Sequence, residues 1–323
     1  MDRLTTGLVD RTAHFMIPSR QMPPSHRSVE FPTLVVAVVI YAGFFGLTGF
    51  FSQWPLWSVA PLCSVVLAWY GSLQHETIHG HPTPYPRFNA LLACIPLSLW
   101  IPYARYRETH LRHHFHEGRY LTEVDHDPES FYLPRGSLAK VGRFRRAIYE
   151  ANRTLCGRIV FGPAVAVLTF WAREARAIRS GDRHRLFIWI RHIVGVCAVL
   201  SWVVGVCHVP LSLYLALIVY PSMALTQVRS YAEHRAEVAS SLRTRVVETN
   251  PVWSLIFLNN NLHIAHHAHP QLPWYRLPPA WRRMRESVPD SGLIFAGYGA
   301  VMRRYLFRPY ITAEHPFAEV GGE

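Results

Sequence analysis

The sequence predicts an all-α integral membrane protein with four transmembrane helices in two hairpins and a cytoplasmic helical cap. Two long apolar stretches lie between residues 31 and 74, and two more lie between residues 186 and 228. Hydrophobic residues make up 50% of the chain, and the mean hydropathy is +0.08, yet the formal net charge is +12. A chain that is both apolar and basic must separate these residues, as membrane proteins with basic cytoplasmic parts do.

The first hairpin consists of two uncharged runs that are each long enough to cross a bilayer. The sequence FPTLVVAVVIYAGFFGLTGFF covers residues 31–51, and about 20 such residues cross a hydrocarbon core of roughly 30 Å. A second run, at about residues 55–74, follows the short turn Ser52-Gln53-Trp54. Residues 1–30 are polar, and we expect them to form a cytoplasmic N-terminal segment.

The region between the hairpins is mostly polar and basic. Its first part, from Leu91 to Tyr103, is apolar but short and contains two prolines, which favours a re-entrant or interfacial segment over a span. Residues 104–185 are expected to form the first part of the cap. Within them, residues 155–171 are moderately apolar and are expected to lie on the membrane surface.

The second hairpin is predicted at residues 186–206 and 211–228, joined by the four-residue turn 207–210. Residues 229–278 are expected to complete the cap. The proline-rich residues 279–323 are expected to form a cytoplasmic C-terminal tail.

Charge predicts the orientation of these spans. Residues 103–185 contain 16 basic and 9 acidic side chains, whereas the two hairpin turns contain no charged residue. The positive-inside rule therefore places both termini and the cap in the cytoplasm. The arginines are scattered around the apolar spans rather than gathered along one soluble face, so a nucleic-acid partner is not expected.

Three histidine-rich motifs lie outside or at the ends of these predicted spans. HETIH, at residues 75–79, ends the second span and matches the H-E-x-x-H zinc signature. HLRHH, at residues 110–114, and HIAHH, at residues 263–267, both follow H-x-x-H-H. On a helix the first, fourth and fifth positions share a face, so we expect each such box to direct three imidazoles to one point. His234 follows the fourth span much as His79 follows the second.

These motifs supply nine candidate metal ligands on the predicted cytoplasmic side. A catalytic zinc uses three protein ligands and a structural zinc four, so nine imidazoles are too many for one metal and suit two. Imidazole binds iron, zinc, copper and nickel, so the ligand type does not identify the metal. The candidates are His75, His79, His110, His113, His114, His234, His263, His266 and His267.

HETIH, HLRHH and HIAHH, in this order around two apolar hairpins, resemble the membrane fatty acid desaturase superfamily, which includes acyl desaturases, lipid hydroxylases, and carotenoid ketolases and hydroxylases. The resemblance covers residues 31–278 and implies a desaturase-like membrane domain there. It implies that the nine histidines hold two iron ions, and that this centre uses O₂ to remove hydrogen from an unactivated C–H bond of a lipid.

The resemblance favours a fatty acyl desaturase that introduces a C=C bond. A lipid hydroxylase and a carotenoid ketolase or hydroxylase stay open, because His269-Pro270 and His79-Gly80 are also found in ketolases. The chain has no His-Pro-Gly-Gly segment and no G-x-G-x-x-G. We therefore expect electrons from a separate ferredoxin- or cytochrome-type protein with its reductase, and we expect the chain in a bacterial inner membrane.

Several residues near the boxes are candidates for supporting roles. Asp125 and Asp127 follow the second box, and a carboxylate there can orient a ligand imidazole through its other ring nitrogen. Glu76 lies within the first box. Asn259 and Asn261, next to the third box, can supply amides or a helix cap. A further pair, Trp274 and Tyr275, fits an interfacial anchor or the substrate entrance.

Two functions from other classes are alternatives to the lipid oxidase. An intramembrane zinc protease would use HETIH but would leave HLRHH and HIAHH without a role. A metal transporter or sensor predicts ionisable ligands along a path inside the spans, whereas these boxes flank the spans. The three boxes together favour the oxidase.

Overall fold

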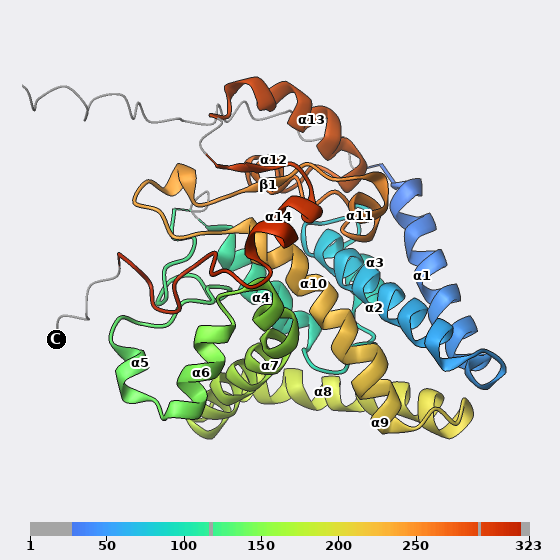
Figure 1. The fold of residues 1–323 in the computed structure, drawn as a ribbon. Helices are drawn as coiled ribbons and strands as arrows, with labels where there is room; N and C mark the ends of the chain where they lie inside the picture. The colour runs from blue at the N-terminus through green and yellow to red at the C-terminus, as the bar shows by residue number, and fades with distance from the viewer. Residues whose placement is uncertain (1–27, 116–118, 290–291, 318–323) are drawn as a thin grey trace, which may run out of the picture.

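The computed structural model describes residues 28–115, 119–289 and 292–317, and it is mostly helical. The long helices α1, α2 and α10 run side by side, and the short elements that follow α10 gather at one end of them (Figure 1). Most of the expected N-terminal segment, residues 1–27, lies outside the described residues.

The first predicted hairpin forms as expected. Helix α1 (Phe31–Gly49) and helix α2 (Leu56–Ile78) are joined by the 3₁₀ turn η1 (Phe51–Gln53). Ile40 of α1 and Tyr70 of α2 are completely buried in one hydrophobic cluster. Helix α2 continues past the predicted end at residue 74, so that most of HETIH lies within its last turn.

The second predicted hairpin also forms, with local changes in helical pitch. Helix α8 (Arg183–Leu200) continues as the π-helical η3 (Ser201–Val206), and α9 (Leu211–Leu213), η4 (Tyr214–Val219) and α10 (Tyr220–Glu233) follow one another without a gap. The side chain of Asp182 caps α8 by accepting a hydrogen bond from the backbone N–H of Arg185 at 3.0 Å.

Among the described residues a fifth helix, α7 (Leu155–Arg179), is also long and apolar enough to cross a membrane. The sequence predicted a shorter apolar piece, residues 155–171. The helix extends further because its charged last two turns have partners: Glu174 is buried and accepts hydrogen bonds from Arg105 Nε at 3.0 Å and Trp189 Nε1 at 3.1 Å. The expected number of four spans is therefore not confirmed by helix length.

Residues 94–102 form a non-helical segment packed among the long helices, after the short helix α3 (Pro86–Ala93). Leu97 in this segment is completely buried. The Tyr70 hydroxyl donates to the carbonyl of Ala93 at 2.6 Å, and the Tyr214 hydroxyl donates to the carbonyl of Leu97. Irregular backbone at membrane depth needs such internal partners, so this packing fits the expected re-entrant segment.

Shorter elements build the cap around the long helices. Those before α7 are α4 (Tyr103–His113), α5 (Ser137–Lys140) and α6 (Arg143–Ala151). Those after α10 are η5 (Ser240–Leu242), β1 (Val246–Val247), α11 (Pro251–Ile256), α12 (His263–Ala268), η6 (Trp274–Arg276), α13 (Leu277–Met284), η7 (Arg285–Ser287), β2 (Ile294–Phe295) and α14 (Tyr298–Tyr305).

The residues expected as a separate tail pack into this cap. Strands β1 and β2 pair in parallel, with Val246 opposite Ile294. Tyr298 and Tyr310 lie in one hydrophobic cluster with Tyr231 of α10. The chain after residue 278 therefore continues the packed domain at least as far as residue 311.

Candidate metal centre

The first box lies where α2 ends. His75 is in the last turn of the helix, and His79 is the residue that terminates it. The following Gly80 has φ of +98°, a left-handed conformation that stops helices and suits glycine. The two imidazoles are one helical turn apart, with ring centroids separated by 4.9 Å.

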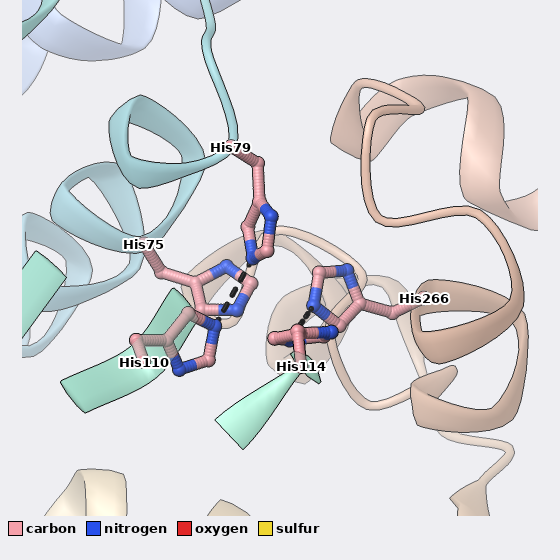
Figure 2. A group of neighbouring side chains, drawn as sticks. All are labelled: His75, His79, His110, His114 and His266. Carbon is pink, nitrogen blue, oxygen red and sulfur yellow. Dashed lines mark hydrogen bonds between the residues drawn. The ribbon is translucent and has the colours of Figure 1, made fainter. Parts of the chain in front are cut away.

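All nine predicted ligands converge, and they divide into two groups. Within each group one ring nitrogen of every histidine lies within 4.8 Å of the others. Figure 2 shows the first group, in which side chains from three separate segments point into one space. The first group contains His75, His79, His110, His114 and His266, and the second contains His113, His234, His263 and His267.

The boxes interleave, which corrects the expectation that each would serve one point. His110 and His114 of α4 join the first group, while His113 joins the second. In α12 the pair His263 and His267 joins the second group, while His266 joins the first. The reason is helical geometry: residues i and i+4 are about 40° apart, while i+3 lies about 60° away on the other side. Each i, i+4 pair serves one group, and the i+3 histidine serves the neighbouring group.

The inward-facing nitrogens have the spacing of ligands around a metal ion. Nε2 atoms lie 3.0 Å apart between His79 and His110, 3.2 Å between His114 and His266, and 2.8 Å between His234 and His263. Two metal–nitrogen bonds of about 2.1 Å at a right angle would hold their nitrogens roughly 3.0 Å apart. The residues present therefore fit two metal ions, one for each group.

The protonation states of these histidines also favour metal binding. Burial lowers the pKa of His79, His110, His114, His263, His266 and His267, with neighbouring imidazoles adding to the shift, and it lowers the pKa of His234 to about 3. These imidazoles are therefore neutral at pH 7, as metal ligands must be. For His113 burial also lowers the pKa, but the charges of Asp127 and Glu129 outweigh it and raise the pKa to about 9.

Two carboxylates after the second box fix the orientation of its histidines. Asp127 accepts a hydrogen bond from His113 Nδ1 at 2.8 Å, and Glu129 accepts one from His110 Nδ1 at 2.9 Å. With Nδ1 engaged, Nε2 is free to face the metal. Asp127 is the residue that the sequence predicted, whereas Asp125 is exposed and Glu129 takes the second position.

Among the three asparagines before the third box, Asn260 is the one that contacts histidines, whereas Asn259 and Asn261 bind backbone carbonyls. Asn260, which was not singled out, contacts both groups: its Oδ1 lies 3.0 Å from His263 Nδ1, and its Nδ2 lies 3.3 Å from His75 Nε2. Asn261 donates to the carbonyl of Val247 at 2.8 Å instead. The cap position of α12 is occupied by Leu262.

Glu76 and Asn259 both bind the peptide of Trp274. Glu76 accepts a hydrogen bond from the Trp274 N–H at 3.1 Å, and Asn259 donates to the Trp274 carbonyl at 3.0 Å. Trp274 packs against the hydrophobic cluster of the long helices. These two side chains therefore position the predicted entrance residues, Trp274 and Tyr275, beside the first box.

The sequence reasoning missed a further carboxylate, Glu233. Its Oε1 lies 3.4 Å from His263 Nδ1 and 3.0 Å from Arg229 Nη1, and the side chain is buried. Glu233, Asn260 and Glu129 each lie next to a residue or motif that the sequence singled out. Adjacency to a predicted ligand was thus the available signal, but the tertiary fold decides which neighbouring residue contacts a histidine.

An apolar groove of about 750 Å³ lies between α2, η4 and α10. Its walls include Trp57, Ala60 and Val65 of α2 and Leu217 and Leu225 of the facing helix. Val65 precedes the first ligand of α2 by ten residues, which is about 15 Å along a helix. The groove is therefore remote from the histidines, and the reaction centre lies at the opposite end of these helices.

These features define a class: a helical protein with several membrane-spanning candidates and two adjoining all-histidine groups that could each hold a metal ion. Comparison with protein families agrees, since residues 52–299 match the model of the fatty acid desaturase family. That match covers most of the chain, and the chain belongs to the fatty acid desaturase family. A comparison with curated proteins gave no match. The family places the chain among membrane oxidoreductases that act on lipids.

Proposed function

We propose that the protein is a fatty acyl desaturase that holds two iron ions and uses O₂ and two electrons to introduce a C=C bond. The observation that carries this proposal is the division of nine buried or half-buried histidines into two adjoining groups. Bound iron would supply the redox couple for O₂ chemistry, which zinc lacks. The five-histidine group and the four-histidine group would each hold one iron.

The chain's own side chains would prepare this site. Asp127, Glu129 and Asn260 hold imidazoles through Nδ1, so that the inward Nε2 atoms keep their positions when metal is absent. Glu76 and Asn259 hold the Trp274 peptide beside the first box. We propose that Trp274 and Tyr275 border the entrance through which the lipid reaches the centre.

We further propose four membrane spans, with α7 lying along the cytoplasmic membrane surface. His79 at the end of α2 and His234 at the end of α10 belong to adjoining metal groups, so the chain must cross the bilayer an even number of times between them. Three candidate helices, α7, α8 with η3, and the run from α9 to α10, lie in that interval. One of them therefore does not cross.

The contacts of α7 support its being that helix. Near its start, Cys156 N donates to the carbonyl of Leu306 at 2.9 Å in the cap. Near its end, Glu174 binds Arg105 of α4, the helix that carries the second box. Both ends thus meet the cap, whereas a span would have one end on the far side. In this proposal residues 1–30, the cap and the C-terminal residues are cytoplasmic, in a bacterial inner membrane.

Electrons would come from a separate ferredoxin- or cytochrome-type protein with its reductase. The histidine groups lie within a cap whose residues 103–185 are net basic, so charge would assist the encounter with an acidic electron carrier. The donor would reach the centre from the cytoplasmic side.

The first experiment is a mass-spectrometric lipid profile of aerobic cells that express the chain or its His263→Ala variant. We expect acyl chains two hydrogen atoms lighter with the wild type and none with the variant. His269→Ala is the matched control, because His269 follows the third box but belongs to neither metal group, and it should keep activity. Purified wild type should contain two iron ions per chain.

Other outcomes would redirect the proposal. Acyl chains one oxygen atom heavier would identify a hydroxylase. Unchanged acyl lipids, with altered carotenoids in a carotenoid-producing host, would identify a ketolase or hydroxylase of that class. Equal product from wild type and His263→Ala would contradict the assignment of the site.

A further inference from the structure

Arg158, in the first turn of α7, is a buried cation that has no carboxylate partner among the described residues. Its side chain is only 4% exposed. The guanidinium stacks on the ring of Phe131, 4.5 Å from the centroid, and lies 5.9 Å from the centroid of Tyr231. Within the described part of the chain its one hydrogen bond runs from Nε to the carbonyl of Asn152 at 3.4 Å, and no carboxylate oxygen lies within 4 Å.

Burying a charge in this way is costly unless a counter-charge is bound. The neighbouring Arg153 does not alter the net charge next to Arg158, because it pairs with Glu150. Its Nε donates to the carbonyl of Ile311 at 3.1 Å. The aromatic faces stabilise the cation by less than its burial costs. Arg158 therefore presents one uncompensated positive charge.

A small cavity lies beside this guanidinium. Its volume is about 10 Å³, which is room for one oxygen-sized group, and its walls include Asn152, Arg153, Arg158 and Thr312. The side-chain oxygen of Asn152 is buried there and has no hydrogen-bond partner among the described residues. Rotating this amide by 180° would place its NH₂ donor at the same point. The cavity thus combines a free cation with an amide that can donate.

In the proposed topology, in which α7 lies on the membrane surface, this cavity would lie at the level of lipid headgroups. On the next turn of α7, Val160 is 49% exposed and Phe161 is 37% exposed, as lipid-facing residues would be. The preceding helix α6 exposes Arg143, Arg145 and Arg146, which raise the positive potential around the mouth.

Local packing keeps the Arg158 side chain in this position. A Cβ atom at Gly162, one turn further along α7, would lie 2.9 Å from Arg158 Cδ. The glycine therefore leaves the space that the arginine stem occupies. The site is built by the fold rather than by a mobile surface side chain.

We propose that Arg158 and Asn152 form a binding site for a phosphate group, one oxygen of which enters the cavity while the remainder lies at its mouth. Arginine recognises phosphate through paired N–H donors, and the guanidinium has these donors free. The same chemistry could come from the headgroup of an anionic phospholipid or from inorganic phosphate. This site is separate from the metal centre and does not depend on the proposed reaction.

The test measures binding to the full chain in detergent by native mass spectrometry, with phosphatidylglycerol and, separately, inorganic phosphate as probes. We expect the wild type to bind one phosphatidylglycerol and Arg158→Gln to bind it at least about tenfold more weakly. Arg158→Lys should recover part of this loss. Arg179→Gln is the matched control, because it removes an exposed arginine at the other end of α7, and its affinity should stay within about twofold of wild type.

If inorganic phosphate binds only when Arg158 is present and displaces the lipid, free phosphate is a ligand of this site. If the lipid binds and inorganic phosphate does not, the ligand is the lipid headgroup. If Arg158→Gln does not fold, thermal unfolding of the wild type decides: either probe should raise the melting temperature in proportion to the logarithm of its concentration. Absence of that rise, or equal binding by wild type and Arg158→Gln, would overturn the proposal and leave the cavity to water.

Discussion

At the scale of single residues, side chains that are not themselves candidate ligands form hydrogen bonds to the histidines and orient their rings. Asn260 is the one side chain among the described residues whose hydrogen bonds join the two metal groups, through His263 and His75. Its exposed fraction is 2%, so its loss would remove the amide contact of His75 Nε2 and leave His263 Nδ1 with only the more distant Glu233 carboxylate. Such partners typically contribute a factor of about 10–100 in metal affinity.

Asn260→Ala should therefore lower metal affinity by about 10–100-fold. Because the asparagine contacts both groups, the second metal should be affected together with the first. The measurement is metal content per chain against free metal concentration. Asn259→Ala is the control, since Asn259 binds the Trp274 carbonyl rather than a histidine. Loss of only one metal from Asn260→Ala would argue against a bridging role.

The raised pKa of His113 leads to a second prediction, about protons. At pH 7 and without metal, His113 carries a proton because its pKa is about 9, whereas a metal ligand must be neutral. Metal binding at pH 7 should therefore release about one proton, and apparent affinity should rise about tenfold per pH unit until pH 9. Calorimetry with Co²⁺ in two buffers of different ionisation enthalpy counts the released protons.

Asp127→Asn should reduce this proton release, because removal of the carboxylate lowers the pKa of His113. Asp125→Asn, which alters an exposed carboxylate two residues away, should release as many protons as the wild type. Equal release from all three proteins would show that Asp127 does not hold the proton on His113.

At the scale of elements, the groove between α2 and α10 offers space for the distal end of an acyl chain. Its walls are apolar and its nearest part lies about 15 Å from the ligands along α2. Substrate chains long enough to reach it would gain contact area. Ala60→Leu fills part of the groove and should shift the products toward shorter acyl chains, while total conversion changes by less than about twofold.

The distribution of product chain lengths, measured by mass spectrometry, checks this prediction. Leu62→Phe is the control, because Leu62 is 48% exposed on the same helix and does not line the groove. An unchanged distribution in Ala60→Leu would mean that the substrate chain follows another path.

At the scale of the whole molecule, the proposed number of four spans rests on where the two hairpins end. A five-span arrangement would put His79 and His234 on opposite sides of the membrane, although their ligand groups adjoin. A four-span arrangement with α7 on the cytoplasmic surface keeps both ends of α7 in contact with the cap.

Single-cysteine variants of a cysteine-free protein can test the topology. Ser180→Cys lies in the exposed turn between α7 and α8, and Gln53→Cys and His208→Cys lie in the two hairpin turns. A membrane-impermeant thiol reagent should label the hairpin turns from outside the cell. Ser180→Cys should react only after the membrane is permeabilised. Labelling of Ser180→Cys from the same side as Gln53→Cys would show that α7 crosses the membrane.

The sequence by itself determined the long apolar helices and the set of histidines that gather in two groups. Apolar runs of sufficient length must become helices in a bilayer, because unpaired backbone groups are too costly there. Three histidine boxes beside them suffice to indicate two metals, and the nine histidines predicted are those that converge. Both results depend on local composition and spacing, which a sequence records directly.

Only the tertiary structure decided how these parts combine. Which histidine joins which group depends on the phase of α4 relative to α12, and Glu129, Asn260 and Glu233 gain their partners from contacts between segments far apart in sequence. The placement of α7 also depends on the tertiary structure. Its apolar stretch is long enough to cross a membrane, but the contacts at both of its ends favour a position on the membrane surface. Helix packing sets relative rotation and depth, and neither quantity is encoded in the spacing of residues along one segment.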